Sequence, residues 1–158
     1  MARELRIAWA GRHRRDSWEA LCDVYRSRIQ RHVRVLDCPV RVRKNRDDRA
    51  RLREEGDALL GIARDDSWIV ALDRRGRMMS SLELAKWLQR KIDSWNGDIV
   101  FLLGSDLGLD TAVLAQARTR LSLGPLTLPH ELARLVLYEQ LYRSVGIAAG
   151  IKYHREPL

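Results

Sequence analysis

The stretch LSLGPLTLPHEL, residues 121–132, decides the fold that we expect for this chain. It begins with a short alternating apolar run that is typical of a strand. Gly124 and Pro125 then force a bend, because glycine permits backbone angles that other residues avoid and proline fixes one angle. Pro129 suits the first position of a helix, where its missing N–H would have no partner. The stretch therefore predicts a strand, a tight loop and a helix start, and the loop is either a plain connector or a backbone cradle for a flat ligand.

The rest of the chain alternates strands with helices. Apolar runs predict strands near residues 4–10, 33–38, 68–72, 99–103 and 121–123, and helical spacing predicts helices near residues 16–31, 48–62, 80–95, 110–120 and from 129 onward. This pattern predicts one α/β domain over residues 1–158, with a parallel-rich sheet covered by helices on both faces. Ligands of such sheets bind beyond the carboxyl ends of the strands, which here are Leu72–Asp73, Leu103–Gly104 and Leu123–Gly124.

Local signals indicate where several of these elements begin and end. Asp16 is a suitable helix N-cap, and Ser80 with Glu83 has the spacing of a capping box. Residues 39–48 predict a polar, basic loop, and residues 73–77 predict a basic turn around their glycine.

The composition predicts a folded cytoplasmic protein. The chain has 158 residues, of which 46% are hydrophobic and 32% are charged, and this balance is typical of a domain that buries a core. No apolar run approaches the roughly 20 residues that a membrane helix needs, so we expect no membrane span. The two cysteines, Cys22 and Cys38, have neither a CxxC motif nor zinc-type histidine spacing. We therefore expect free thiols and no metal site.

The positive charge is concentrated in the first third of the chain. Residues 1–53 contain 15 Arg and one Lys against seven acidic residues, a net charge of +9, whereas the remainder has a net charge of −1. Arg accounts for 25 of the 29 basic residues, and its planar guanidinium binds phosphate through two parallel hydrogen bonds. This placement indicates a nucleic-acid partner, and we expect Arg41, Arg43 and Lys44 to contribute to it.

Four further segments reveal a family resemblance. They are the glycine turn GSDLG at residues 104–108, the LTLPH run at residues 126–130, Glu139-x-x-Tyr142-Arg143, and the terminal YHRE at residues 153–156. Together they resemble the SPOUT-class RNA methyltransferases of the small bacterial RlmH type, over nearly the whole chain. The resemblance departs from the family pattern Gly-Gly-x-x-Gly at Ser105, and at Leu107, where the family usually has a polar residue.

The resemblance implies a cofactor, a fold and an oligomeric state. It implies S-adenosylmethionine as the cofactor, held in a C-terminal half tied in a trefoil knot, and a homodimer in which one subunit's tail lies beside the other's cofactor. Glycines let the backbone approach the ligand, and leucines can cover the faces of the adenine. The positions that match the family's cofactor contacts are Leu72, Gly104, Leu123, Gly124, Pro125, Leu126, Thr127 and Leu128.

The resemblance also implies the reaction, methylation of N3 of a pseudouridine in 23S ribosomal RNA, with the assembled ribosome as the expected substrate. The base must lose its N3 proton, and His154 is the side chain best able to titrate near neutral pH. Tyr153 is expected to stack on the base, and Arg143 and Arg155 to hold phosphate or developing negative charge. We expect His130 to have only a structural role in positioning the loop before it.

Two other functions remain open at this stage. Because Ser105 and Leu107 depart from the family pattern, the chain could instead be a non-catalytic RNA-binding or ribosome-assembly protein of the same fold. A nucleotide-binding protein of Rossmann type is disfavoured, because no GxGxxG motif follows the first strand. The last predicted helix is apolar around most of its circumference, which suggests a subunit contact that includes Leu137 and Leu141.

Overall fold

The computed structural model describes residues 1–11, 16–43 and 47–155, and within them five strands form one parallel sheet. The strands are β1 (Leu5–Ala10), β2 (Val35–Val40), β3 (Trp68–Met78), β4 (Ile99–Leu103) and β5 (Thr119–Ser122). The helices are α1 (Ser17–Ile29), α2 (Asp48–Leu60), α3 (Ser81–Ser94), α4 (Thr111–Gln116) and α5 (His130–Ala148). The strand order is β2-β1-β4-β3-β5, so β1, β4 and β3 are internal.

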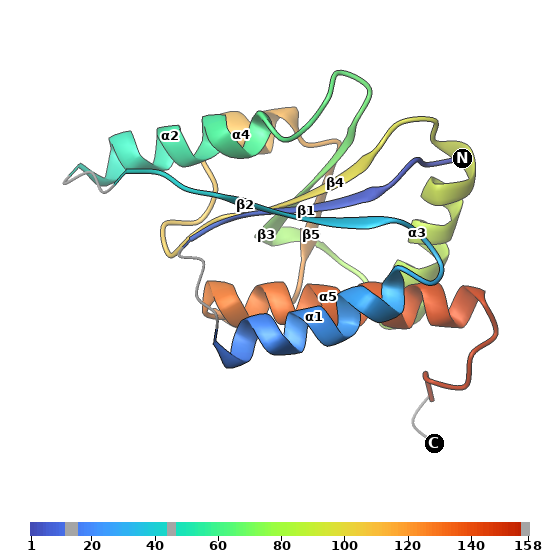
Figure 1. Ribbon diagram of the computed structural model, residues 1–158. Helices are drawn as coiled ribbons and strands as arrows, with labels where there is room; N and C mark the ends of the chain where they lie inside the picture. Colours follow the sequence, from blue (N-terminus) through green and yellow to red (C-terminus); the bar gives the residue numbers. More distant parts are fainter. Residues whose placement is uncertain (12–15, 44–46, 156–158) are drawn as a thin grey trace.

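The helices cover both faces of the sheet, which confirms the predicted α/β architecture. Helices α1, α3 and α5 lie on one face, and α2 and α4 lie on the other (Figure 1). The central strand β4 shows why: Ile99, Phe101 and Leu103 point into the first core, whereas Val100 and Leu102 point into the second. Successive side chains of a strand point to opposite faces, so a continuously apolar strand needs cover on both sides.

The cap signals read from the sequence are confirmed. The Asp16 side chain accepts hydrogen bonds from the backbone N–H groups of Trp18 and Glu19 and thereby caps α1. Ser80 and Glu83 form a reciprocal capping box at the start of α3, which satisfies two N–H groups that a helix leaves without partners. The backbone hydrogen bond from Ser80 lowers the pKa of the Glu83 carboxyl.

The predicted turn at residues 73–77 is wrong, because β3 continues through it to Met78. The pairing with β5 shifts register between Leu72 and Arg77, and both of these residues pair with Leu121. The intervening residues bulge out of the ladder. A Cβ on Gly76 would lie 2.7 Å from the Arg120 carbonyl oxygen, so the two backbones approach where only glycine fits.

Four predicted boundaries are also wrong. Helix α4 ends at Gln116 rather than near residue 120, and β5 begins at Thr119 because residues 119–121 pair with β3. Pro39 belongs to β2 rather than to a loop, and an edge strand tolerates the missing N–H. Pro129 is the N-cap of α5 instead of its first helical residue, with an extended ψ of 145°.

The apolar circumference of α5 is largely explained within the chain itself. Helix α5 packs against both α1 and α3, with the sheet beneath it. Leu137 and Leu141, which we expected at a subunit contact, are fully buried in this core. A long helix between two others needs apolar residues on three sides, so the all-round pattern does not by itself indicate a second subunit.

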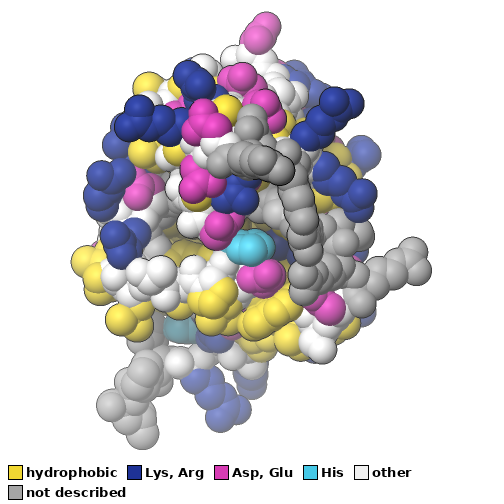
Figure 2. All heavy atoms as spheres, turned by 90° about the vertical axis from the view of Figure 1, so that its left-hand side faces the viewer, with side chains coloured by type: hydrophobic (Ala, Val, Ile, Leu, Met, Phe, Trp, Pro, Cys, Tyr) yellow, Lys and Arg dark blue, Asp and Glu magenta, His cyan; other side chains and the backbone are white. Residues whose placement is uncertain are grey.

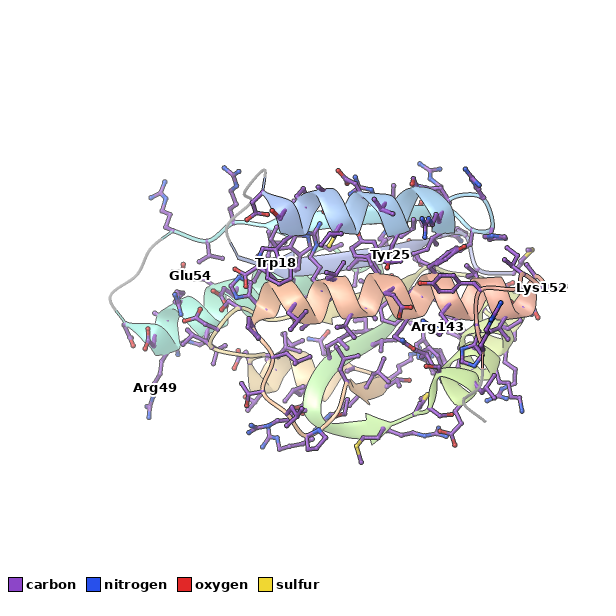
Figure 3. All side chains as sticks on the ribbon, turned by 90° about the horizontal axis from the view of Figure 1, so that it is seen from below. Trp18, Tyr25, Arg49, Glu54, Arg143 and Lys152 are labelled. Atoms are coloured by element: carbon purple, nitrogen blue, oxygen red, sulfur yellow. The ribbon has the colours of Figure 1, made fainter. Side chains whose placement is uncertain are left out.

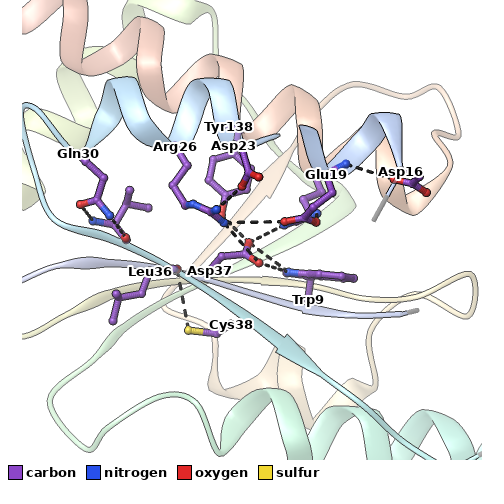
Figure 4. A network of polar contacts seen from close by, with 12 residues as sticks. Trp9, Asp16, Glu19, Asp23, Arg26, Gln30, Leu36, Asp37, Cys38 and Tyr138 are labelled. Carbon is purple, nitrogen blue, oxygen red and sulfur yellow. Dashed lines mark hydrogen bonds and ion pairs between the residues drawn. The ribbon is translucent and has the colours of Figure 1, made fainter. Parts of the chain in front are cut away.

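A buried cation fastens α5 to the elements around it. Arg134 is 5% exposed, and its guanidinium donates to Glu19 of α1 at 2.8 Å and to Asp37 of β2 at 2.8 Å. It also lies over the Trp9 ring of β1, 4.2 Å from the centroid. Asp37 accepts further hydrogen bonds from the Trp9 indole and the Tyr138 hydroxyl (Figure 4). Three elements are thus tied to α5 through one side chain.

Replacing Arg134 with Leu should therefore lower the free energy of unfolding by about 3 kcal/mol, because it leaves two largely buried carboxylates with only the more distant Arg26, at 3.9 and 4.0 Å, as a cation. Urea unfolding at a fixed protein concentration measures this loss. The double variant Arg134→Leu/Asp37→Leu should lose less than the sum of the two single variants, since the groups interact directly. A cost for Arg134→Leu of under about 1 kcal/mol, the scale of an exposed ion pair, would contradict this description.

Candidate functional site

The predicted cofactor-contact positions meet at the carboxyl edge of the sheet. Ala71 of β3 pairs with Leu102 of β4, so Leu72 and Gly104 follow at the exits of neighbouring strands. Leu72 also pairs with Leu121 of β5, two residues before the loop 123–128. Leu72, Gly104 and this loop therefore lie around one place, as expected from parallel strands that end at the same edge.

The loop 123–128 is held at its base and open along its length. The Ser122 hydroxyl donates to the Arg74 carbonyl at 2.9 Å and accepts from the Gly124 N–H at 3.1 Å. Arg74 donates in turn to the Thr127 hydroxyl at 3.0 Å. Gly124 has a φ of +121°, which favours glycine, and Leu126 is 78% exposed. An apolar side chain held out beside exposed backbone is suited to covering one face of an aromatic ligand.

The glycine turn 104–108 is closed by its own backbone and tied to α2. A Cβ on Gly104 would lie 2.0 Å from the Gly108 carbonyl oxygen, so the turn cannot accept a side chain there. The Ser105 hydroxyl donates to Glu55 at 2.7 Å, and Arg51 donates to both oxygens of Asp106 at 3.1 Å. Ser105, the departure from the family pattern, therefore has a structural partner in α2.

The Asp106 carboxylate is engaged in the ion pair with Arg51. Partial burial raises the pKa of its carboxyl, but the hydrogen bond and the charge of Arg51 outweigh burial and hold the pKa below its ordinary value. Asp106 is the only carboxylate in the glycine turn, and its oxygens face Arg51 rather than the space where a ligand would lie.

A hollow lies next to Gly104, where β1 and β4 end and α1 and α5 begin. Its walls include Trp9, Trp18, Leu103, His130 and Glu131, with Arg134 at the bottom. The His130 Nε2 lies 3.2 Å from a Glu131 carboxylate oxygen. Sequence reasoning assigned no functional role to Trp18 or Glu131. One sequence signal could have indicated Trp18. It is an aromatic residue in the first turn of a helix that follows a strand, α1 after β1.

The predicted catalytic residues of the tail are together, packed against the second half of α5. The Tyr153 hydroxyl donates to Glu139 at 3.1 Å, and Arg143 donates to the His154 Nδ1 at 3.1 Å. Arg143 also forms an ion pair with Glu139, whereas Arg155 is exposed. Burial raises the pKa of the Tyr153 phenol to about 12, and hydrogen bonds with Tyr25 and Glu139 contribute to the rise. Glu156 lies outside the described residues.

The tail and the cofactor-contact positions are separated along α5 within one chain. The tail contacts Glu139 and Arg143, which follow the first residue of α5 by nine and 13 residues, or roughly 14 and 20 Å at a rise of about 1.5 Å per residue. Figure 3 shows Trp18 near one end of the paired helices α1 and α5 and Arg143 toward the other end. The two predicted halves of the site are therefore not brought together inside a single subunit.

Arginines flank the carboxyl edge on both sides. Arg41 and Arg43 are exposed just after β2, and Arg74 and Arg75 are exposed where β3 bulges beside β5. Because β2 and β5 are the two edge strands, these pairs lie on opposite flanks. Figure 2 views this edge and shows basic side chains at both sides, with acidic side chains and a histidine between them. Lys44 lies outside the described residues.

The described residues give no support to a metal site, a membrane span or a reactive thiol. Within the described residues, no group of three His, Cys, Asp or Glu side chains is placed to hold a metal ion. No helix in that part of the chain is long and apolar enough to cross a membrane. Cys22 and Cys38 are free thiols, and burial raises the pKa of Cys22 to about 11, against the opposing charge of Arg134. Its reactive thiolate form is therefore scarce at neutral pH.

Comparison with known proteins identifies the class of the chain. The family model described as "Predicted SPOUT methyltransferase" matches residues 3–154, so the chain belongs to the SPOUT methyltransferase family. Among curated relatives, it is 39% identical to the ribosomal RNA large subunit methyltransferase H of Solidesulfovibrio magneticus, over 95% of this chain and 97% of that protein. It is 38% identical to the protein of the same name from Gloeobacter violaceus, over the same shares of the two chains.

A solved structure supports the fold alone. The probable methylase family protein from Haemophilus influenzae superposes with a TM-score of 0.54 at 18% sequence identity, over 98% of this chain and 72% of that one. Its identity to this chain is too low to indicate anything about residue roles.

Replacing Gly104 with Ala should weaken S-adenosylmethionine binding by about tenfold or more, equal to at least about 1.4 kcal/mol. The added methyl group would displace the Gly108 carbonyl and distort the turn. Isothermal titration calorimetry measures the affinity, and circular dichroism checks that the variant is folded. Gly146→Ala in α5 is the matched control, since the nearest atom to its Cβ would be 4.0 Å away. Equal affinities for the folded Gly104→Ala variant and the wild type would show that the turn does not hold the cofactor.

Proposed function

We propose that this protein is an S-adenosylmethionine-dependent methyltransferase that methylates N3 of a pseudouridine in 23S ribosomal RNA, in the cytoplasm. The single observation that supports this most strongly is the similarity, over almost the full length of both chains, to proteins named ribosomal RNA large subunit methyltransferase H. The arginine flanks of the carboxyl edge suit a polyanionic substrate. The shape of assembled ribosomal RNA, rather than a short sequence, is the expected target.

The carboxyl edge fits the proposed cofactor. Leu72, Leu123, Leu126 and Leu128 offer apolar surface for an adenine ring, and the turn at Gly104 and the loop 123–128 bring backbone close to a ligand. S-adenosylmethionine, when bound, supplies an electrophilic methyl group on a sulfonium. The open space around the Cβ position of Gly124, together with the exposed Leu126, is consistent with an adenosine covered by this loop.

The tail supplies the proposed substrate side of the site. His154 is the candidate that receives the N3 proton of the base, and Tyr153 offers an aromatic face for stacking. Arg143 orients both residues through Glu139 and His154, and the exposed Arg155 is free to meet a phosphate. Most of the rate enhancement in a methyl transfer of this kind can come from orientation.

We propose that the active site is completed by a second copy of the chain. The tail contacts α5 at Glu139 and Arg143, roughly 14 and 20 Å along the helix from the end that follows its own cofactor loop, at about 1.5 Å per residue, and this separation favours service to the site of another subunit. The outer face of α1 exposes Leu21 (45%) and Val24 (42%), and apolar side chains left open on a helix face favour association. These residues, rather than the buried Leu137 and Leu141, are the ones that we assign to the homodimer contact.

We also propose that residues 1–158 form one domain with a C-terminal trefoil knot. Residues 119–127 run against residues 72–78 through strand pairing, through Ser122 to Arg74, and through Arg74 to Thr127. This close passage of two distant segments is what a knotted crossing requires. Knots are rare among proteins, so the family membership of the chain is the main support.

A second candidate is a non-catalytic RNA-binding or ribosome-assembly protein of the same fold. Ser105 and Leu107 favour it, since both depart from the family's glycine turn. Calorimetry with S-adenosylmethionine separates the two candidates, because a protein that has lost the cofactor site gives no binding heat.

The proposed function predicts that the purified protein, incubated with ribosomes from a strain lacking this activity, produces 3-methylpseudouridine in a nuclease digest analysed by mass spectrometry. A variant lacking residues 153–158 should produce none, while it keeps the dimer and binds S-adenosylmethionine within about threefold of the wild type. Absence of product with the intact protein would refute the proposed function.

Mixing a variant that binds the cofactor weakly with a variant that lacks the tail tests the shared site, at a cofactor concentration too low for Gly104→Ala to bind it. Co-refolding equal amounts of Gly104→Ala and the tail-less variant makes half of the dimers mixed, each with one complete site, so roughly a quarter of the wild-type activity should return. A mixture as inactive as its components would show that each tail serves its own subunit.

A further inference from the structure

The hollow beside Gly104 has no role in the function proposed so far. It opens at the exits of β1 and β4, between the first turns of α1 and α5, and the two arginine flanks lie on either side of it (Figure 2). It shares Gly104 with the predicted cofactor positions, whereas Leu72 and the loop 123–128 are not part of its walls. A molecule in the hollow would thus be a neighbour of the cofactor rather than a substitute for it.

The enclosed part of the hollow is small, about 20 Å³, so a flat ring would lie at its open mouth, against the side chains that form its walls. Trp18 lies in the first turn of α1, half-buried at the rim, and belongs to neither of the two hydrophobic cores among the described residues. The His130 ring forms another wall, and Gly11 makes room for it, since a Cβ there would lie 3.1 Å from the His130 Nε2. Two aromatic rings from different helices therefore border the same space. Stacking on such rings is how proteins hold extruded bases.

The charges of the hollow do not suit a phosphate. Its one buried cation, Arg134, already serves Glu19 and Asp37. The carboxylates of Asp16 and Glu131 line the same space, and carboxylates are acceptors that repel anions. Phosphates should therefore bind at the flanking arginines, and the hollow should receive a neutral group that donates hydrogen bonds.

We propose that this hollow binds the target base and that Glu131 selects pseudouridine over uridine; the proposal rests on the proposed function. Pseudouridine is joined to its ribose through carbon, so both of its ring nitrogens carry N–H groups, whereas uridine carries only N3–H. Glu131 offers an acceptor for N1–H, the donor that only pseudouridine has, while N3–H is left to face the cofactor and His154. Trp18 provides the stacking face, and His130 holds the Glu131 carboxylate in place at 3.2 Å.

This arrangement explains selectivity through an unpaired acceptor. When uridine occupies the hollow, the Glu131 carboxylate loses its hydrogen bond to water and gains no N–H donor from the base. Sites built to hydrogen-bond a particular N–H or O–H discriminate strongly against analogues that lack it. The side chain that matters is Glu131, because Asp16 already uses one carboxylate oxygen to cap α1.

The indole N–H resonances of the five tryptophans test the proposal. Pseudouridine nucleoside, titrated into the wild-type protein, should shift the Trp18 resonance saturably, and the Trp18→Phe variant identifies that signal. The Trp95 indole, bonded to the Asp66 carbonyl at the opposite edge of the sheet, should stay in place as an internal control. Uridine should bind about tenfold or more weakly than pseudouridine.

Variants at single carboxylates complete the test. Glu131→Gln should reduce the preference for pseudouridine to below about threefold, while Glu54→Gln, exposed on α2, should leave it unchanged. A Trp18 resonance that does not move, or a preference that survives in Glu131→Gln, would overturn the proposal. Ribosome methylation by the wild type separates the two failures, since methylation without a Trp18 shift removes only the base pocket and leaves the proposed function standing.

Discussion

The buried guanidinium of Arg134 is the interaction on which the rest of this structure depends. It joins α5 to α1 through Glu19, to β2 through Asp37 and to β1 through the Trp9 ring. Burial disfavours its charged form, but the hydrogen bonds to Glu19 and Asp37 outweigh burial and raise the pKa of Arg134. Burial and the nearby Asp37 carboxylate likewise raise the pKa of the Tyr138 phenol, which keeps it a donor. The same side chain forms the bottom of the hollow at the carboxyl edge, so one group both fixes α5 and shapes the candidate site.

A fully parallel sheet then determines where chemistry can occur. Every strand ends at the same edge of the sheet, and the segment that follows each strand places different side chains or backbone there. The end of β2 and the bulge of β3 bring exposed arginines, β4 brings the glycine turn, and β5 brings the loop 123–128. The centre of the edge is aromatic and acidic, whereas its flanks are basic. Such a surface can hold the phosphates of an RNA at its sides and leave its centre for a base.

The sequence predicted those parts of the fold that local patterns determine. Strand β4 was predicted at its observed bounds because five apolar residues in a row can be satisfied only between two helical layers. The end of β3 was missed because its charged, glycine-containing extension has no apolar period, and only the pairing with β5 makes it a strand. The start of β5 was missed for the same reason, since Thr119 and Arg120 look like the end of a helix until β3 pairs with them.

The candidate site was predictable only where single segments carry it. The glycine turn and the loop 123–128 are each continuous in sequence, and the structure places them at the same edge of the sheet, after the strands on either side of β3, although their role in binding a cofactor stays a prediction. The hollow draws Trp18, Gly104 and Glu131 from three distant segments, and no local pattern connects these residues. The structural role of Arg134 could not be predicted either. Its partners Glu19 and Asp37 lie far from it in the sequence and meet it only in the folded chain.

If the carboxyl edge binds the cofactor while the tail of the same subunit lies elsewhere, hydrogen exchange followed by mass spectrometry, with and without S-adenosylmethionine, should show it. Backbone amides in residues 72–74, 104–108 and 123–128 should exchange more slowly when the cofactor is added. Amides of the amino edge, including residues 66–68, should exchange at unchanged rates. Protection confined to other segments, or no protection at a saturating concentration of cofactor, would show that the cofactor does not bind at this edge.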